Sequence, residues 1–214
     1  MILPFDELNL LQEKYSMPFL DAKSIEKKDV IDEVEDLLVL AYVYGVSNIN
    51  ESLGTTLETD PESARKVIFD KTDGLSFSER ISTYFDASVD DGKGGLKVDI
   101  SGQYTDLLEA IKRIAETETT RVFNESMFEN AKKAEDEANG NGSPEGWRSV
   151  TKTWMTVGDD KVRDTHSFLD GTTIKLNEKF WTYDGDEAYA PGGFSKASNV
   201  INCRCWCEYG WSME

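Results

Sequence analysis

The stretch NGNGSPEGWRSVTKTWMTV, residues 139–157, marks the point at which the sequence changes from one pattern to another. It opens with Gly, Asn, Ser and Pro, a composition typical of linkers and turns. From Ser149 onward polar and apolar residues alternate, which predicts a β-strand with one buried face. The chain therefore divides at this linker into two parts that differ in the spacing of their apolar residues. The residues on one face of the strand would be Val150, Lys152, Trp154 and Thr156.

The part before the linker repeats apolar residues every three or four positions, as amphipathic helices do. One helix is predicted from about Ser24, where this spacing begins, and a long helix over about residues 104–138. Asp60 and Pro61 predict the start of another helix, because Asp is a favoured N-cap and Pro fits the first turn. The remaining expectations are an extended arm over 1–25, a helix over 76–89 and a turn-rich break over 90–95.

The part after the linker predicts short helices and strands. A short helix is expected within DDKVRDTHSFLDG, residues 159–171, capped by Asp159 or Asp160 and ended by Gly171. The further elements are a strand over 172–176, a turn over 189–193 and a final strand over 202–211.

The expected fold class is α+β. A helical N-terminal region with a long helix would precede a small mixed α/β C-terminal domain with a short antiparallel sheet. The 214 residues are enough to bury a substantial core. The expected boundaries are 1–138 for a helical docking region, 139–148 for the Gly-rich linker and 149–214 for the small α+β domain.

The chain is strongly acidic, with 41 acidic against 23 basic residues and a formal net charge of −18. A surface of this charge repels phosphate backbones, which argues against nucleic-acid binding, whether specific or not.

The N-terminus lacks the basic and apolar regions of a signal peptide, and no stretch reaches the roughly 20 apolar residues of a membrane span. We expect no membrane association, and a reducing compartment, since the cysteines show no disulfide framework.

All three cysteines lie in NCRCWC, residues 202–207, at every second position. On a strand they would share one face, and His166, the single histidine, would complete a Cys₃His set of the kind that binds zinc. The alternative is that Cys203, Cys205 and Cys207 are small buried residues that pack a sheet. Zinc ligands usually come as spaced pairs from turns, so we favour packing and expect neither a metal nor a cofactor.

His166 also raises the question of catalysis, because a Cys–His pair or a Ser–His–Asp group can be assembled from residues of this chain. The sequence has no nucleophile-elbow motif and no glycine-rich phosphate loop. We therefore expect no catalytic site, and instead a buried polar network that joins the short helix to the last strand. Its members would be Arg163, His166, Asp170, Asn202 and Arg204.

The competing interpretation is a toxin-like effector enzyme, either an ADP-ribosyltransferase or a ribonuclease, that uses Arg163, His166 and Asn202. Exposure separates the two interpretations. A catalytic histidine must line a cleft with room for substrate, whereas a network histidine is covered.

Within the predicted long helix, Glu118, Arg121 and Glu125 stand three and four residues apart. This spacing predicts ion pairs along one face of the helix. A helix this acidic is expected to present a solvated face or a docking face.

Several motifs occur together in a specific order. They are ETETTRVFNES (116–126), KTWMTVGDDKVRDTHSFLDG (152–171), EKF (178–180), APGG (190–193) and INCRCWC (201–207). Over about residues 105–207 this set resembles the C-terminal domain of phage Mu F-like minor head proteins, the phage head morphogenesis family. Cys207 is not part of the family pattern. The matching residues are Glu118, Asn124, Lys152, Trp154, Asp159 (or Asp160), Arg163, His166, Leu169, Asp170, Gly171, Phe180, Pro191, Gly192, Asn202, Cys203, Arg204 and Cys205.

The resemblance implies a minor capsid protein of a tailed phage, located in the virion and, during assembly, in the host cytoplasm. It implies the portal protein as partner, the major capsid or scaffolding protein as further candidates, and several copies around the portal. Head assembly and genome packaging or ejection are the implied roles, without enzymatic activity. Some relatives carry a fused toxin or enzyme domain; because this sequence ends soon after INCRCWC, we expect no such fusion here.

Overall fold

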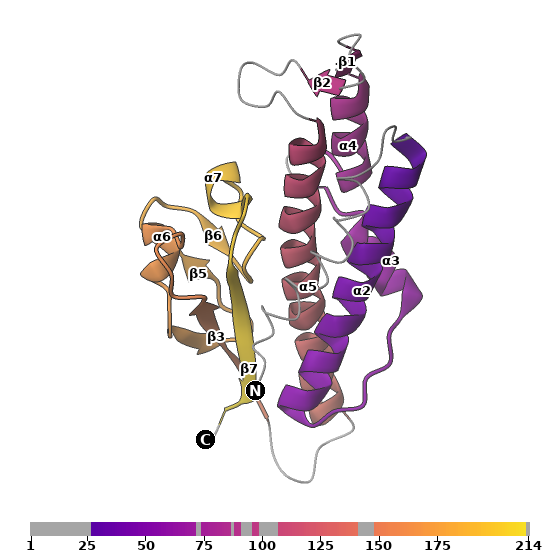
Figure 1. Ribbon diagram of the computed structural model, residues 1–214. Coiled ribbons are helices and arrows are strands. Elements are labelled where there is room, and N and C mark those ends of the chain that lie inside the picture. The colour runs from indigo at the N-terminus through magenta and orange to yellow at the C-terminus, as the bar shows by residue number, and fades with distance from the viewer. Residues whose placement is uncertain are drawn as a thin grey trace.

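Helix α5, Leu107–Asn139, is the central element of the structure, and the other elements lie on two sides of it (Figure 1). The computed structural model describes residues 27–71, 74–86, 88–90, 96–98, 107–140 and 148–212. Helices α2, α3 and α4 cover one side of α5, and the C-terminal strands lie on the other. The middle of α5 is therefore buried almost all round, which no surface helix would be. The long helix predicted over 104–138 is confirmed, with its start at Leu107.

The N-terminal helices are α2 (Lys27–Leu53), α3 (Pro61–Ile68) and α4 (Phe77–Asp86). The predicted cap of α3 is confirmed: the Asp60 carboxylate accepts hydrogen bonds from the backbone N–H groups of Glu62 and Ser63 at 3.3 and 3.0 Å. The apolar stripe of α2 faces the core, as its spacing predicts. Its buried residues are Val30, Val34, Leu37, Leu38, Ala41, Tyr42, Gly45, Val46, Ile49 and Leu53.

Helices α2 and α5 approach each other most closely at Gly45. A Cβ atom at this position would lie 2.7 Å from the Cβ of Ser126 and 2.9 Å from the carbonyl oxygen of Phe123. The Ser126 hydroxyl donates to the carbonyl of Tyr42 at 2.7 Å, so a hydrogen bond also joins the two helices here. Glycine is required because any side chain would push the helices apart.

The C-terminal strands form an antiparallel sheet in the order β4–β3–β7, with bounds Thr173–Lys175, Val150–Thr156 and Cys205–Trp211. Lys152 pairs with Tyr209 and Trp154 pairs with Cys207 across β3 and β7. The face predicted from the alternation in β3 is confirmed, because Val150, Lys152 and Trp154 are buried. The α+β class is confirmed too. Two further ladders join β1 (Ser88–Asp90) with β2 (Leu96–Val98) and β5 (Phe180–Trp181) with β6 (Glu187–Ala188).

Two expected boundaries in the C-terminal part are wrong. Helix α6 spans only Asp164–Ser167, because residues 159–162 form a turn in which Asp159 accepts the backbone N–H groups of Lys161 and Val162. Asp159 and Asp160 therefore do not cap this helix. The last strand begins at Cys205 rather than at residue 202, since Asn202 adopts a positive φ of 54° after helix α7 (Ala197–Val200) and ends the preceding turn.

The hydrophobic core continues from the helices into the strands. The indole N–H of Trp211 in β7 donates to the carbonyl of Leu53 in α2 at 3.0 Å, which ties the two parts together. The predicted domain boundary over 139–148 stays a prediction. The arm over 1–25, residues 141–147 of the linker and the break over 91–95 lie outside the described residues. Among the described helices, none combines the length and the hydropathy needed to cross a membrane.

Candidate functional site

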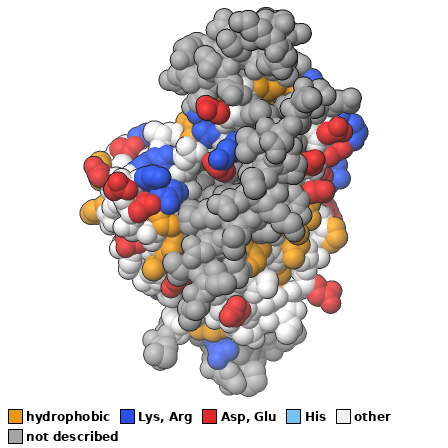
Figure 2. Space-filling view, in the orientation of Figure 1, with side chains coloured by type: hydrophobic (Ala, Val, Ile, Leu, Met, Phe, Trp, Pro, Cys, Tyr) orange, Lys and Arg blue, Asp and Glu red, His pale blue; other side chains and the backbone are white. Residues whose placement is uncertain are grey.

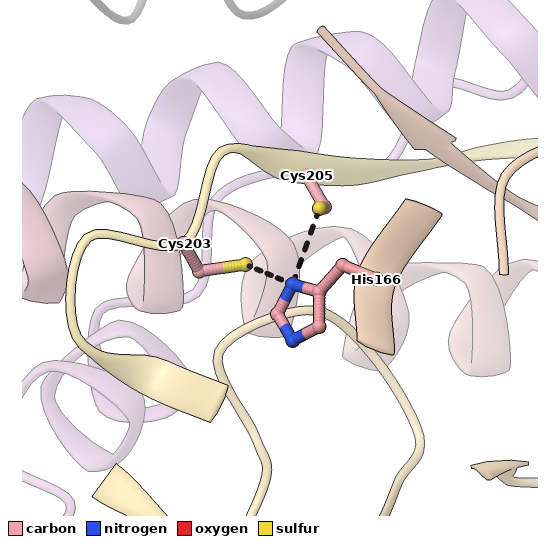
Figure 3. Close-up of side chains that lie close together, drawn as sticks. All are labelled: His166, Cys203 and Cys205. Carbon is pink, nitrogen blue, oxygen red and sulfur yellow. Dashed lines mark hydrogen bonds between the residues drawn. The ribbon is translucent and has the colours of Figure 1, made fainter. Parts of the chain in front are cut away.

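The imidazole of His166 is the centre of a buried cluster with two of the three cysteines (Figure 3). His166 lies in α6 and is 1% exposed. Its Nδ1 atom lies 3.6 Å from Cys203 Sγ and 3.5 Å from Cys205 Sγ. His166 comes from α6, whereas Cys203 and Cys205 lie two residues apart where the turn after α7 leads into β7, so folding brings these two parts of the chain together.

The turn after α7 carries Cys203 toward the histidine. The backbone N–H of Cys203 donates to the carbonyl of Val200 at 3.0 Å, and that of Asn202 donates to Thr117 Oγ1 in α5 at 3.2 Å. The positive φ of Asn202 lets the chain reverse here before it enters the strand. The side-chain amide of Asn124 in α5 then donates to the carbonyl of Cys205 at 3.1 Å. Helix α5 thus holds the backbone of Cys205 directly and that of Asn202, next to Cys203.

Aromatic rings enclose the cluster. Trp154 of β3 lies edge-on to the imidazole with ring centroids 5.4 Å apart, and Phe194 lies at 5.5 Å. These contacts exclude water from the ring. His166 Nε2 is buried and has no hydrogen-bond partner among the described residues. Burying a polar nitrogen in this way is costly.

The two clustered thiols have different proton affinities. A hydrogen bond with the Cys205 thiol, together with His166, holds the pKa of Cys203 well below the usual value for cysteine. The hydrogen bond with Cys203 and burial raise the pKa of Cys205. Of the two thiols, Cys203 therefore loses its proton more readily than Cys205.

Cys207 lies apart from this cluster, so the three cysteines do not form one group around His166. It lies beside Lys152, and burial raises the pKa of the Cys207 thiol to about 12. Lys152 is fully buried, and its Nζ donates to the carbonyl of Tyr189 at 2.7 Å. Burial lowers the pKa of Lys152 to about 8. The Cys₃His set is therefore wrong in its membership, because only Cys203 and Cys205 reach His166.

The single buried network expected around His166 is not found. Arg163 donates to the carbonyl of Ile201, and Arg204 pairs instead with Asp159 at the half-exposed edge of the domain. Asp170 and Asn202 are exposed. Asp170 accepts the backbone N–H of Thr156 at 2.7 Å. Arg163 does join the α6 region to the turn before β7, but of the five predicted members only His166 is buried.

The ion pair predicted within α5 is present, but its burial was not predicted. The predicted pair of Glu118 and Arg121 is present at 2.8 Å, but both side chains are inside the protein. Arg80 of α4 also donates to Glu118, and Arg121 donates to the carbonyl of Val67 at 3.0 Å. The third residue of the pattern, Glu125, has a pKa raised by burial. The spacing of these residues predicts the pair but not the helices that cover it.

Sequence reasoning missed Asp186, whose carboxylate organises the loop before α7. It accepts the backbone N–H groups of Ser195 and Lys196 at 3.1 and 2.9 Å, the Ser195 hydroxyl at 2.7 Å and the Asn199 amide at 3.1 Å. Burial alone would raise the pKa of Asp186, but these hydrogen bonds outweigh it and lower the pKa to about 2. The sequence signal is weak, because the partners follow nine to thirteen residues later.

A cavity of about 740 Å³ lies between α5 and the turn that contains Pro191. Charged residues of both signs line it, among them Arg121, Glu125 and Lys132. His166, Cys203 and Cys205 do not line this cavity. Arg163 and Asn202 do not line it either, so the cavity offers no cleft for the enzyme interpretation.

Large apolar side chains gather on the outside of the C-terminal part. Phe168, Trp181 and Tyr183 are 68%, 61% and 65% exposed, and the rings of Phe168 and Tyr183 meet edge-on at 6.5 Å. Trp181 ends β5, and Tyr183 lies in the turn that follows it. In Figure 2 acidic and basic side chains lie interspersed over the described part of the face shown, without a broad basic patch there.

Comparisons with known proteins give two matches. The family model for phage Mu protein F like proteins matches residues 80–208, more than half of the chain. A 57-residue segment, 27% of this chain, is 39% identical to the NAD(+)–arginine ADP-ribosyltransferase EFV of Enterococcus faecalis (strain ATCC 700802 / V583). The match covers 12% of that protein. No solved structure gives a significant match.

Proposed function

The chain belongs to the phage Mu protein F like family of bacteriophage head morphogenesis proteins, and from this we propose that it is a minor head protein that binds the portal. It would act in head assembly and in genome packaging or ejection, in several copies around the portal. The observation that carries the proposal is the extent of the family match, which includes α5 and nearly all of the C-terminal strands that pack on it.

The surface of the C-terminal part supports a role in protein binding. Phe168 and Tyr183 form an exposed aromatic surface, Trp181 of the same part is also exposed, and such side chains are enriched in protein interfaces. We propose that this aromatic surface contacts the portal. The net charge of −18 favours a protein partner over the phosphate backbone of the genome.

We also propose that the chain acts without catalysis. Support comes from His166, which is 1% exposed and enclosed by Trp154 and Phe194, so a substrate cannot reach it. Asn202, by contrast, is exposed, so the residues of the enzyme interpretation do not line one cleft. The similarity to the Enterococcus faecalis transferase covers too little of that protein to carry its activity over.

Co-expression with the portal protein of the same phage tests the proposal. Affinity purification of the portal should retain the chain in a fixed ratio, and cryo-electron microscopy should show added density at the portal. The variant Phe168→Ser with Tyr183→Ser should lose most of this binding. The control is Val39→Ser with Val43→Ser. It removes two exposed apolar side chains, 41% and 42% exposed, from helix α2.

The possible outcomes separate the parts of the proposal. Loss of binding only in the α2 variant would move the contact to the helical region, as the sequence predicts for residues 1–138. No retention of the wild-type chain by the portal would contradict the proposed partner. Transfer of ADP-ribose to arginine, or RNA cleavage, by purified protein would contradict the absence of catalysis.

A further inference from the structure

We propose that His166, Cys203 and Cys205 bind a single zinc ion through Nδ1 and the two Sγ atoms. This site is separate from the proposed portal contact and does not depend on it. The ion would join α6 to the segment where the turn after α7 leads into β7 (Figure 3).

The distances fit tetrahedral zinc. Zinc binds imidazole nitrogen at about 2.0–2.1 Å and thiolate sulfur at about 2.3 Å, so a tetrahedral centre places these atoms about 3.6 Å apart. The observed separations from Nδ1 are 3.6 Å to Cys203 Sγ and 3.5 Å to Cys205 Sγ. All three atoms lie within 4.8 Å of one another, so one ion can reach them together. The two Nδ1–Sγ distances therefore suit tetrahedral zinc without any movement of these side chains.

Hydrogen bonding explains the arrangement less well. A neutral imidazole has a single lone pair, on one ring nitrogen, and that lone pair accepts one hydrogen bond well. Here two sulfur atoms converge on the same Nδ1 at nearly equal distances. Nε2 meanwhile has no partner among the described residues, so the buried ring gains little from its surroundings. A metal ion at the point where one lone pair and two thiolates converge satisfies all three.

The chemistry of the ligands selects zinc. Thiolate and imidazole together suit zinc rather than calcium or magnesium, which prefer oxygen ligands. A metal binds the thiolate form of cysteine, so binding releases thiol protons and the affinity falls as the pH falls.

The structure removes the sequence-based objection to zinc. Three ligands in alternation on one strand are not a usual zinc set, but Cys203 lies in a turn outside the strand and Cys207 lies elsewhere. The ligands therefore come from a short helix, a turn and a strand start. An ion held there would link these segments of a small domain, as structural zinc does.

The first test is the zinc content of purified full-length protein after refolding with zinc and removal of free metal. We expect one zinc per chain in the wild type and less than a tenth of that in Cys203→Ser and Cys205→Ser. The matched control is Cys207→Ser, which removes another buried thiol of the same strand and should retain the full zinc content. A chelator should lower the melting temperature of wild type and Cys207→Ser but leave the two ligand variants unchanged.

Cobalt substitution keeps the proposal testable if a ligand variant does not fold. Wild-type protein loaded with Co²⁺ should show thiolate-to-metal charge-transfer bands and the intense visible bands of a tetrahedral centre. Wild-type protein that binds no metal, or that gives the weak spectrum of octahedral cobalt, would overturn the proposal. So would equal loss of zinc in Cys203→Ser and Cys207→Ser.

Discussion

Gly192 packs directly on the backbone of Arg121, so that a Cβ atom at position 192 would lie 2.9 Å from the Arg121 Cα. This contact seats the turn after β6 on α5, beside the buried ion pair of Arg121 with Glu118. Gly192 also has a φ of +87°, a conformation that side chains disfavour. Two independent physical reasons thus require glycine at the junction between the helices and the C-terminal part.

Replacing Gly192 by alanine should destabilise the protein by about 2–4 kcal/mol, because conformational strain and a steric clash add. The control is Gly185→Ala, where φ is +80° but no atom lies within 4 Å of the added Cβ. It should cost only the strain, about 1 kcal/mol. Urea unfolding of both variants measures the difference, and equal losses would show that the contact with Arg121 is unimportant.

Replacing Glu118 by glutamine should cost about 3–5 kcal/mol, because it leaves Arg121 and Arg80 without their buried carboxylate. Glu116→Gln provides the comparison, since its pair with Lys112 at 3.7 Å is exposed and worth less than about 0.5 kcal/mol. Thermal unfolding at neutral pH compares the two variants. A Glu118 variant as stable as the Glu116 variant would contradict the importance of the buried pair.

Asp186 should contribute to the loss of stability in acid. Its pKa is about 2 in the folded protein against 3.8 for a free side chain, so its contribution is complete above about pH 4 and is lost as the pH falls toward 2. The shift corresponds to about 2 kcal/mol. Asp186→Asn should lower the free energy of unfolding at pH 7 and show a smaller further decrease between pH 4 and pH 2. Parallel pH profiles for wild type and variant would refute this role.

Lys152 should make the free energy of unfolding increase with pH in mild alkali. Its folded-state pKa of about 8 lies below the ordinary 10.5, so the folded protein loses this proton first and gains relative stability as the pH rises from 8 toward 10.5. Lys152→Met lacks this titration. The stability of wild type relative to the methionine variant should therefore increase by about 1 kcal/mol for each pH unit above 8. Paired urea titrations at pH 7.5 and 9.5 measure the change, and a constant difference would contradict it.

The helices and the central strand could be predicted from the sequence because their signals are local. The spacing of apolar residues in α2, the Asp60–Pro61 cap and the alternation around Trp154 each act within a few residues. The start of α6 was mispredicted because Asp159, which resembles an N-cap, instead closes a turn and pairs with Arg204. Local propensity does not reveal a partner 45 residues away.

The candidate site could be predicted only as a set of residue types. The pattern of His166 and the cysteines allowed zinc as an alternative, but packing was favoured because the sequence placed all three cysteines on one strand. The left-handed conformation of Asn202 moves Cys203 off that strand. The residues next to Asn202 in the sequence do not predict this conformation. The burial of Glu118 was equally hidden, because an i, i+3 pair looks the same on a solvated helix as on one that is covered from both sides.

The bond from Trp211 to the carbonyl of Leu53 has a consequence for synthesis on the ribosome. Helix α2 and helix α5 leave the ribosome well before β7, yet β7 contacts both of them and also pairs with β3. Until β7 emerges, the nascent chain exposes apolar side chains that have no cover. The emergence of β7 from the ribosome is therefore the step that lets the helices finish packing, and chains truncated before β7 should be captured by chaperones or proteases.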